Sequence, residues 1–134
     1  MATTTAAITL TSTDLLSDSL SLSTTATLTK AGGAVGLDQT SGLGRKTTTS
    51  TSQYVLFDGT DYAADKAHKL YLKNTSTTDS EYFILTINAE EIGRIYAGDW
   101  VFMPWSGHDA DNDIKITPSV ATTMTLEYML IYEA

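Results

Sequence analysis

The chain has 134 residues, of which 24 are Thr and 12 are Ser, and it carries a formal net charge of -8. This length fits one domain with its own hydrophobic core, and the absence of cysteine excludes disulfides, thiolate metal sites and cysteine nucleophiles. The acidic balance argues against nucleic-acid binding, because phosphates attract a cationic surface. No apolar run approaches the roughly 18 residues of a membrane helix. Because the first cation is Lys30, we also expect a soluble protein without a signal peptide.

The first 53 residues form a polar segment that differs from the rest of the chain. They contain 23 of the 36 hydroxyl residues and none of the aromatic residues, which run from Tyr54 to Tyr132. Small apolar residues nevertheless alternate with Ser and Thr at a period of two, which is typical of β-strands. The residues that share one face are Ile8, Leu10, Leu20, Leu22, Ala26 and Leu28. We expect strands here, and a flexible Ser/Thr-rich tail is the alternative for residues 1–18.

A long loop is predicted after these strands. Residues 31–44 hold five of the nine glycines, which allow chain reversals without steric cost. The loop ends at the adjacent cations Arg45 and Lys46, and alternation resumes over Thr47–Phe57, which predicts one strand. We therefore expect residues 1–53 to form an arm with a Gly-rich loop, partly β, and residues 54–134 to form a separate β-sandwich domain.

The C-terminal part is predicted to be a series of short strands. Their ranges are His68–Lys73, Glu81–Ile87, Ile92–Tyr96, Trp100–Trp105, Asp113–Thr117 and Thr123–Glu133. The strongly apolar Glu81–Ile87 is expected at the centre of a sheet, and Pro104 places the end of its strand at an edge or at the exit from the sheet. Only residues 61–69 could hold a helical turn. Many short strands with frequent turn signals predict an all-β fold, an antiparallel β-sandwich or jelly roll.

Three carboxylates alternate in one polar loop, at Asp109, Asp111 and Asp113, as they do in many calcium loops. The EF-hand pattern requires Gly and Glu where this chain has Ile114 and Val120. We therefore expect a solvated acidic turn, with a calcium site of another type as the alternative.

The same loop contains residue types found in hydrolases. Ser106, His108 and Asp109 lie within four positions of one another. A short surface loop does not place a nucleophile, a base and an orienting group in line, and triads are recognised by that geometry. We expect no enzymatic activity and no cofactor.

The densest aromatic cluster comprises Tyr96, Trp100, Phe102 and Trp105. Aromatic rows on β-sandwiches can stack on sugar rings, so a carbohydrate-binding module is one interpretation. The spacing of these residues favours packing in the core or at a subunit interface.

Several short motifs resemble one group of viral proteins. They are Ile92-Gly93-Arg94, Gly98-Asp99-Trp100, Met103-Pro104-Trp105 and Glu127-Tyr128-Met129, together with the earlier stretch Thr27–Thr47. In these features the chain resembles small β-rich structural proteins of tailed bacteriophages, especially cyanophages. The resemblance implies a virion component, made in the host cytoplasm, and transfers no catalytic residues.

The resemblance and the composition together predict a capsid decoration (cement) protein that binds the capsid or other virion proteins, as a homo-oligomer and by analogy a trimer. A tail, neck, adaptor or fibre-associated protein is the alternative. One-sided strands need a partner surface, so the arm is expected to dock on a neighbouring subunit, without contact to nucleic acid or membrane. The expected interface residues are Ile8, Leu10, Leu20, Leu22, Leu28, Arg45 and Lys46.

Overall fold

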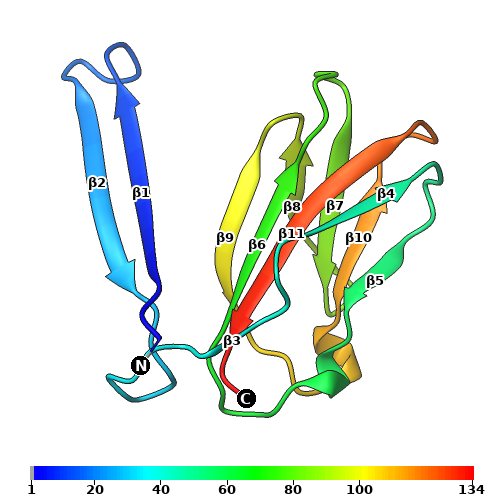
Figure 1. Cartoon of the computed structure of the whole chain (residues 1–134). Helices are drawn as coiled ribbons and strands as arrows, with labels where there is room; N and C mark the ends of the chain where they lie inside the picture. The colour runs from blue at the N-terminus through cyan, green and yellow to red at the C-terminus, as the bar shows by residue number, and fades with distance from the viewer. Residues whose placement is uncertain (1) are drawn as a thin grey trace.

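The computed structural model describes residues 2–134, which form a two-stranded arm beside a β-sandwich (Figure 1). In this part of the chain the helical structure consists of two short 3-10 turns, at Gly59–Asp61 and Ala110–Asn112. Neither is long or apolar enough to cross a membrane. The first turn ends at Asp61, so it overlaps only the first of residues 61–69, the range that could hold a helical turn.

The arm is an antiparallel hairpin of β1 (Thr5–Ser12) and β2 (Leu20–Thr27). Its register places Leu10 opposite Leu22 and Ala6 opposite Ala26, so the small apolar residues share one face. At the tip, the Ser12 hydroxyl accepts a hydrogen bond from the Leu15 N–H at 3.0 Å. The predicted strands are therefore confirmed, and the alternative of a flexible tail is wrong over residues 5–12. Met1 lies outside the described residues.

One layer of the sandwich is a four-stranded antiparallel sheet. Its order is β5 (Tyr54–Phe57), β10 (Ile114–Pro118), β7 (Tyr82–Ile87) and β8 (Glu90–Tyr96). The apolar strand β7 lies between β10 and β8, as its composition predicts, so both of its edges are paired.

The other layer is a five-stranded sheet. The C-terminal strand β11 (Met124–Tyr132) pairs with β6 (His68–Asn74), which pairs with the edge strand β9 (Trp100–Trp105). The opposite side of β11 receives β3 (Gln39–Thr40) and β4 (Gly44–Thr48). Residues 39–48 therefore belong to this sheet rather than to the hairpin.

The prediction of one continuous strand over Thr47–Phe57 is wrong, because β4 and β5 lie in different sheets. Between them, hydroxyl groups compete for the backbone: the Ser50 N–H donates to the Thr48 hydroxyl at 3.2 Å, and the Ser52 N–H donates to the Ser50 hydroxyl at 3.0 Å. Such local side-chain acceptors favour turns over strand pairing.

The core lies between the two sheets and comes from inward-facing residues of both. Its members are Phe57, Leu70, Leu72, Phe83, Leu85, Ile95, Trp105, Ile114, Ile116, Met124, Leu126 and Leu130. The prediction of an all-β antiparallel sandwich is confirmed, and its finer form as a jelly roll is not.

Candidate interaction surface

The outward face of β6 and β9 carries an uncovered aromatic cluster. Tyr71 pairs with Phe102 across the two strands, and Lys73 pairs with Trp100. Trp100 is 51 % exposed and Phe102 is 36 % exposed, so neither belongs to the core. Large exposed aromatic residues in one patch are typical of binding surfaces. We refer to Tyr71, Lys73, Trp100 and Phe102 as the aromatic face.

The aromatic cluster was expected in the core or at a subunit interface, and Trp105 lies in the core. Tyr96, Trp100 and Phe102 are exposed, so for them packing in the core is wrong and packing at a subunit interface stays a prediction. Both faces of β9 are apolar, because Val101, Met103 and Trp105 alternate with Trp100 and Phe102. A period of two shows which residues share a face but not which face points inward.

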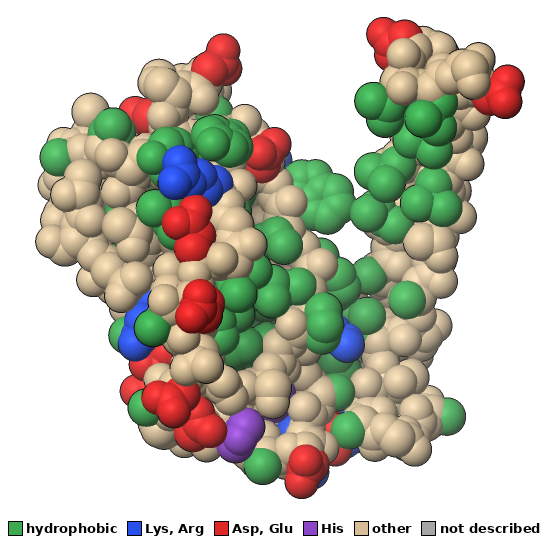
Figure 2. Space-filling model, turned by 180° about the vertical axis from the view of Figure 1, so that it is seen from behind, with side chains coloured by type: hydrophobic (Ala, Val, Ile, Leu, Met, Phe, Trp, Pro, Cys, Tyr) green, Lys and Arg blue, Asp and Glu red, His purple; other side chains and the backbone are tan. Residues whose placement is uncertain are grey.

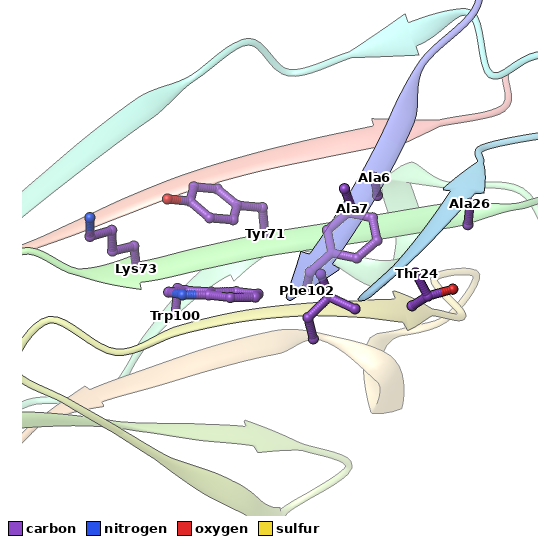
Figure 3. Close-up of a pocket in the computed structure, with 9 residues that line it drawn as sticks. Ala6, Ala7, Thr24, Ala26, Tyr71, Lys73, Trp100 and Phe102 are labelled. Carbon is purple, nitrogen blue, oxygen red and sulfur yellow. The ribbon is translucent and has the colours of Figure 1, made fainter. Parts of the chain in front are cut away.

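The arm stands over this face and leaves an open groove between the two. The groove has a volume of about 550 Å³ and is lined by the aromatic face and by Ala6, Ala7, Ile8, Thr24 and Ala26 of the arm. In Figure 3, Phe102 projects from β9 close to the arm residue Ala7, and Trp100 lies farther along the same strand near Lys73. Small side chains on one wall thus face large rings on the other.

Figure 2 shows the same arrangement on the molecular surface. Hydrophobic side chains line the hollow on both the arm and the body, and acidic side chains gather at the tip of the arm. The distal leucines of the arm, Leu10 and Leu22, remain 45 % and 46 % exposed. The body therefore does not cover the apolar row of the arm.

One polar group of the aromatic face, the Tyr71 hydroxyl, is already engaged. The Tyr71 hydroxyl donates to Glu127 at 3.1 Å, and Arg45 forms an ion pair with the same carboxylate at 2.8 Å. The hydrogen bond from Arg45 is the main cause that lowers the pKa of Glu127. Within residues 2–134, Lys69 and Lys73 have neither an ion pair within 4.0 Å nor an aromatic ring beneath the ammonium group. They flank Tyr71 on β6.

The base of the arm is fixed by backbone bonds and a small buried pair. Leu28 is 4 % exposed and Leu37 is 2 % exposed. The Leu28 N–H donates to the Thr4 carbonyl at 2.8 Å, and the Leu37 N–H donates to the Leu28 carbonyl at 3.0 Å. Glu133 ties this base to the body by accepting the Ala31 N–H at 2.9 Å.

The structure divides the residues expected at an interface into three groups. Ile8, Leu10, Leu20 and Leu22 lie on the arm, with Ile8 in the groove. Leu28 is buried in the base, so it is not available to a partner. Arg45 is paired with Glu127, and Lys46 lies over the Tyr54 ring at 4.6 Å, so both already make a contact within this chain.

Sequence reasoning missed Tyr71 and Lys73 as surface residues. The signal was present, because they alternate with Leu70 and Leu72 and so must point away from the core. The sequence does not show that β9 pairs with β6, so it could not place these two residues beside Phe102 and Trp100.

The three carboxylates considered for calcium make separate local contacts. Asp109 accepts the N–H groups of Asp111 and Asn112 at the start of a 3-10 turn, whereas Asp113 accepts the Gly59 N–H at 2.8 Å. Across residues 2–134, no three acidic, His or Cys side chains are grouped so that they could hold a metal ion.

His108 lies on the surface, with its Nε2 3.2 Å from Asp109. No hydrogen bond among the described residues joins Ser106 to His108, so the arrangement of nucleophile, base and orienting group is not assembled here.

The chain matches no protein-family model, no curated protein sequence and no solved structure.

Proposed function

We propose that this chain is a non-enzymatic structural protein of a phage virion and that it decorates the capsid, where its arm and aromatic face hold neighbouring subunits together. The observation that carries the proposal is the pairing of an uncovered aromatic face with an uncovered apolar arm. Exposed apolar surfaces of this kind are stabilised when another subunit covers them. The short motifs that resemble phage structural proteins supply the biological setting.

The charge of the chain supports a place away from the packaged genome. The formal net charge is -8, and six of the eight cations already contact an acidic group or an aromatic ring of the same chain. A surface of this kind repels phosphate groups. An outer shell position or a protein–protein contact fits it better.

The copy number in the particle tests the proposal. Purified virions of the phage that encodes the chain are digested, and the chain is quantified by mass spectrometry against the major capsid protein. Hundreds of copies per particle are expected of a decoration protein. About six or twelve copies would overturn the capsid assignment in favour of the tail or neck, and absence from the particle would overturn the virion role.

The aromatic face also favours a second candidate function, the binding of glycans, because exposed rings stack on sugar rings. Docking of protein is favoured over it, because a sugar also needs hydrogen-bonding groups beside the rings. The Tyr71 hydroxyl is engaged by Glu127, which leaves Lys73, Thr24 and the indole N–H of Trp100 as the polar groups of the groove. Fluorescence of Trp100 during titration with glycans distinguishes the two functions, since docking of protein predicts no response.

A further inference from the structure

The arm and the aromatic face form a complementary pair of surfaces within one chain. The arm offers the small residues Ala6 and Ala26 opposite each other, and the body offers the large rings of Phe102 and Trp100. Each copy of the chain has one arm with small apolar residues and one aromatic face that can accept an arm. Apart from Ala7, the other face of the arm is made of Ser and Thr, so an arm can cover only one apolar surface at a time.

The arm needs a covering surface that its own body does not provide. A two-stranded hairpin alone is marginally stable in water. Its apolar row is separated from its own aromatic face by the open groove of about 550 Å³. Beyond the groove, Leu10, Leu15, Leu16 and Leu22 are all exposed. Burying them against another molecule stabilises the arm and removes a large apolar surface from water.

The distribution of charge indicates which molecule covers the arm. Between residues 2 and 29 the arm carries two charged side chains, Asp14 and Asp18, both at the tip. On the aromatic face and beside it on β6 lie Lys73 and Lys69, which have no ion pair among the described residues. An acidic arm therefore fits a lysine-flanked aromatic face, and both are present in every copy of the chain.

We propose that the arm of one copy packs on the aromatic face of a second copy of this chain. Exchange of an identical element between copies is a low-cost route to an oligomer, and here it would cover the arm and the aromatic face of both copies, which the open groove leaves uncovered within one chain. This inference rests on the proposed function, because both treat the arm as an element that docks on another subunit. It deepens that function by naming the partner of the arm.

The natural absence of cysteine allows a direct test. One protein carries Ile8→Cys and a second, isotopically labelled protein carries Phe102→Cys. The two are unfolded, mixed and refolded, and a short bis-maleimide crosslinker is added. Arm exchange predicts a crosslinked peptide that joins a labelled and an unlabelled chain. In the matched control, Thr49→Cys replaces Phe102→Cys on an exposed loop between β4 and β5, and little product is expected.

A chain that carries both Ile8→Cys and Phe102→Cys shows where the arm lies when it is not exchanged. Crosslinking only within one chain in the double variant, with no product between chains above the Thr49→Cys background, would overturn the proposal. A second measurement uses light scattering of proteins with unaltered apolar surfaces. We expect the wild type to form an oligomer and Lys69→Glu/Lys73→Glu to shift toward the monomer mass, while Lys115→Glu on the other sheet leaves the oligomer intact. A wild type with the mass of a monomer at all concentrations would contradict arm exchange.

These experiments use purified protein without capsids, so their outcome is separate from the copy number in the virion. An exchanged oligomer that is missing from virions would support the inference and overturn the proposed function. A monomer present at hundreds of copies per virion would support the proposed function and overturn the inference.

Discussion

The side-chain amide of Asn74 joins the two sheets of the sandwich by donating to the carbonyl oxygen of Ile95 at 3.0 Å. Asn74 ends β6 in the five-stranded sheet, and Ile95 lies in β8 of the four-stranded sheet. The same amide donates to the Glu81 carbonyl at 3.2 Å, and its oxygen accepts the Ser76 N–H at 3.0 Å. Asn74 is fully buried, so no water replaces these bonds.

Replacing Asn74 with Ala is expected to destabilise the sandwich by about 1–3 kcal/mol, because buried carbonyl groups lose their donor. Asn74→Asp is expected to cost at least as much, since a buried carboxylate has no donor to offer these oxygens. Denaturant unfolding measures both changes. Thr49→Ala, at an exposed position, serves as the control, and an unfolding free energy for Asn74→Ala equal to that of the control would contradict this role.

Because His68 is buried, the protein is expected to lose stability in mild acid. The His68 ring is 2 % exposed and packs among Tyr62, Trp105 and Tyr132. Burial lowers the pKa of His68 below the ordinary value of 6.5 and outweighs the opposing effects of the nearby backbone and of Glu133. The unfolded chain therefore takes up a proton first, so the free energy of unfolding falls as the pH drops below 6.5 and levels off at the lower, folded pKa.

Unfolding curves between pH 7.5 and pH 5 measure this effect. His68→Phe, which places a ring in the same aromatic surroundings, is expected to flatten the pH dependence. His108→Gln changes the exposed histidine and should keep the wild-type slope. An equal slope in wild type and His68→Phe would show that other groups cause the acid sensitivity.

Glu133 is expected to hold the base of the arm against the body. Its carboxylate accepts the Ala31 N–H at 2.9 Å and contacts Lys66 at 3.3 Å. The bond from Ala31 is the main cause that lowers the pKa of Glu133, so the stabilisation is present above the ordinary value of 4.5 and is lost as the pH falls through the lower, folded value. Glu133→Ala should therefore speed amide exchange at Ala31 and proteolysis near Gly32, while Glu90→Ala, at an exposed position, should leave both unchanged.

Gly36 is required at the base of the arm for steric reasons. A Cβ atom at this position would overlap the backbone carbonyl of Ala2, and Gly36 also forms a β-bridge with Thr29. Gly36→Ala is expected to displace the first residues of the chain and to increase amide exchange at Leu28, whose N–H donates to Thr4. Gly93→Ala is the matched control, because a Cβ there meets no atom within 4 Å. Equal exchange at Leu28 in the two variants would contradict this explanation.

Most strands could be predicted from the sequence, because a period of two and turn residues are local signals. The ranges around β6, β7, β9 and β11 agree with the structure to within one or two residues. The pairing of β4 with β11 could not be predicted in this way, since it joins residues more than 75 positions apart, such as Thr47 and Thr125. No local pattern encodes such a partner.

The candidate surface was predicted only on the arm side. The alternation of Leu20 and Leu22 with serines is one-sided, so it identifies an apolar face directly. The acceptor side was missed because β9 is apolar on both faces, and only the packed sandwich shows that Trp105 points inward while Trp100 points outward. Buried polar residues such as His68 and Asn74 were missed for a related reason, since their surroundings come from distant strands.

The position of β11 in its sheet has a consequence for how the protein is made on the ribosome. The arm is a local hairpin of residues 5–27, and hairpins of this kind form within microseconds. The aromatic face lies on a sheet whose inner strand β11 is the last to be synthesised. Each nascent arm therefore emerges before its own acceptor surface exists, and the finished acceptor surfaces that it can meet during synthesis belong to chains completed earlier.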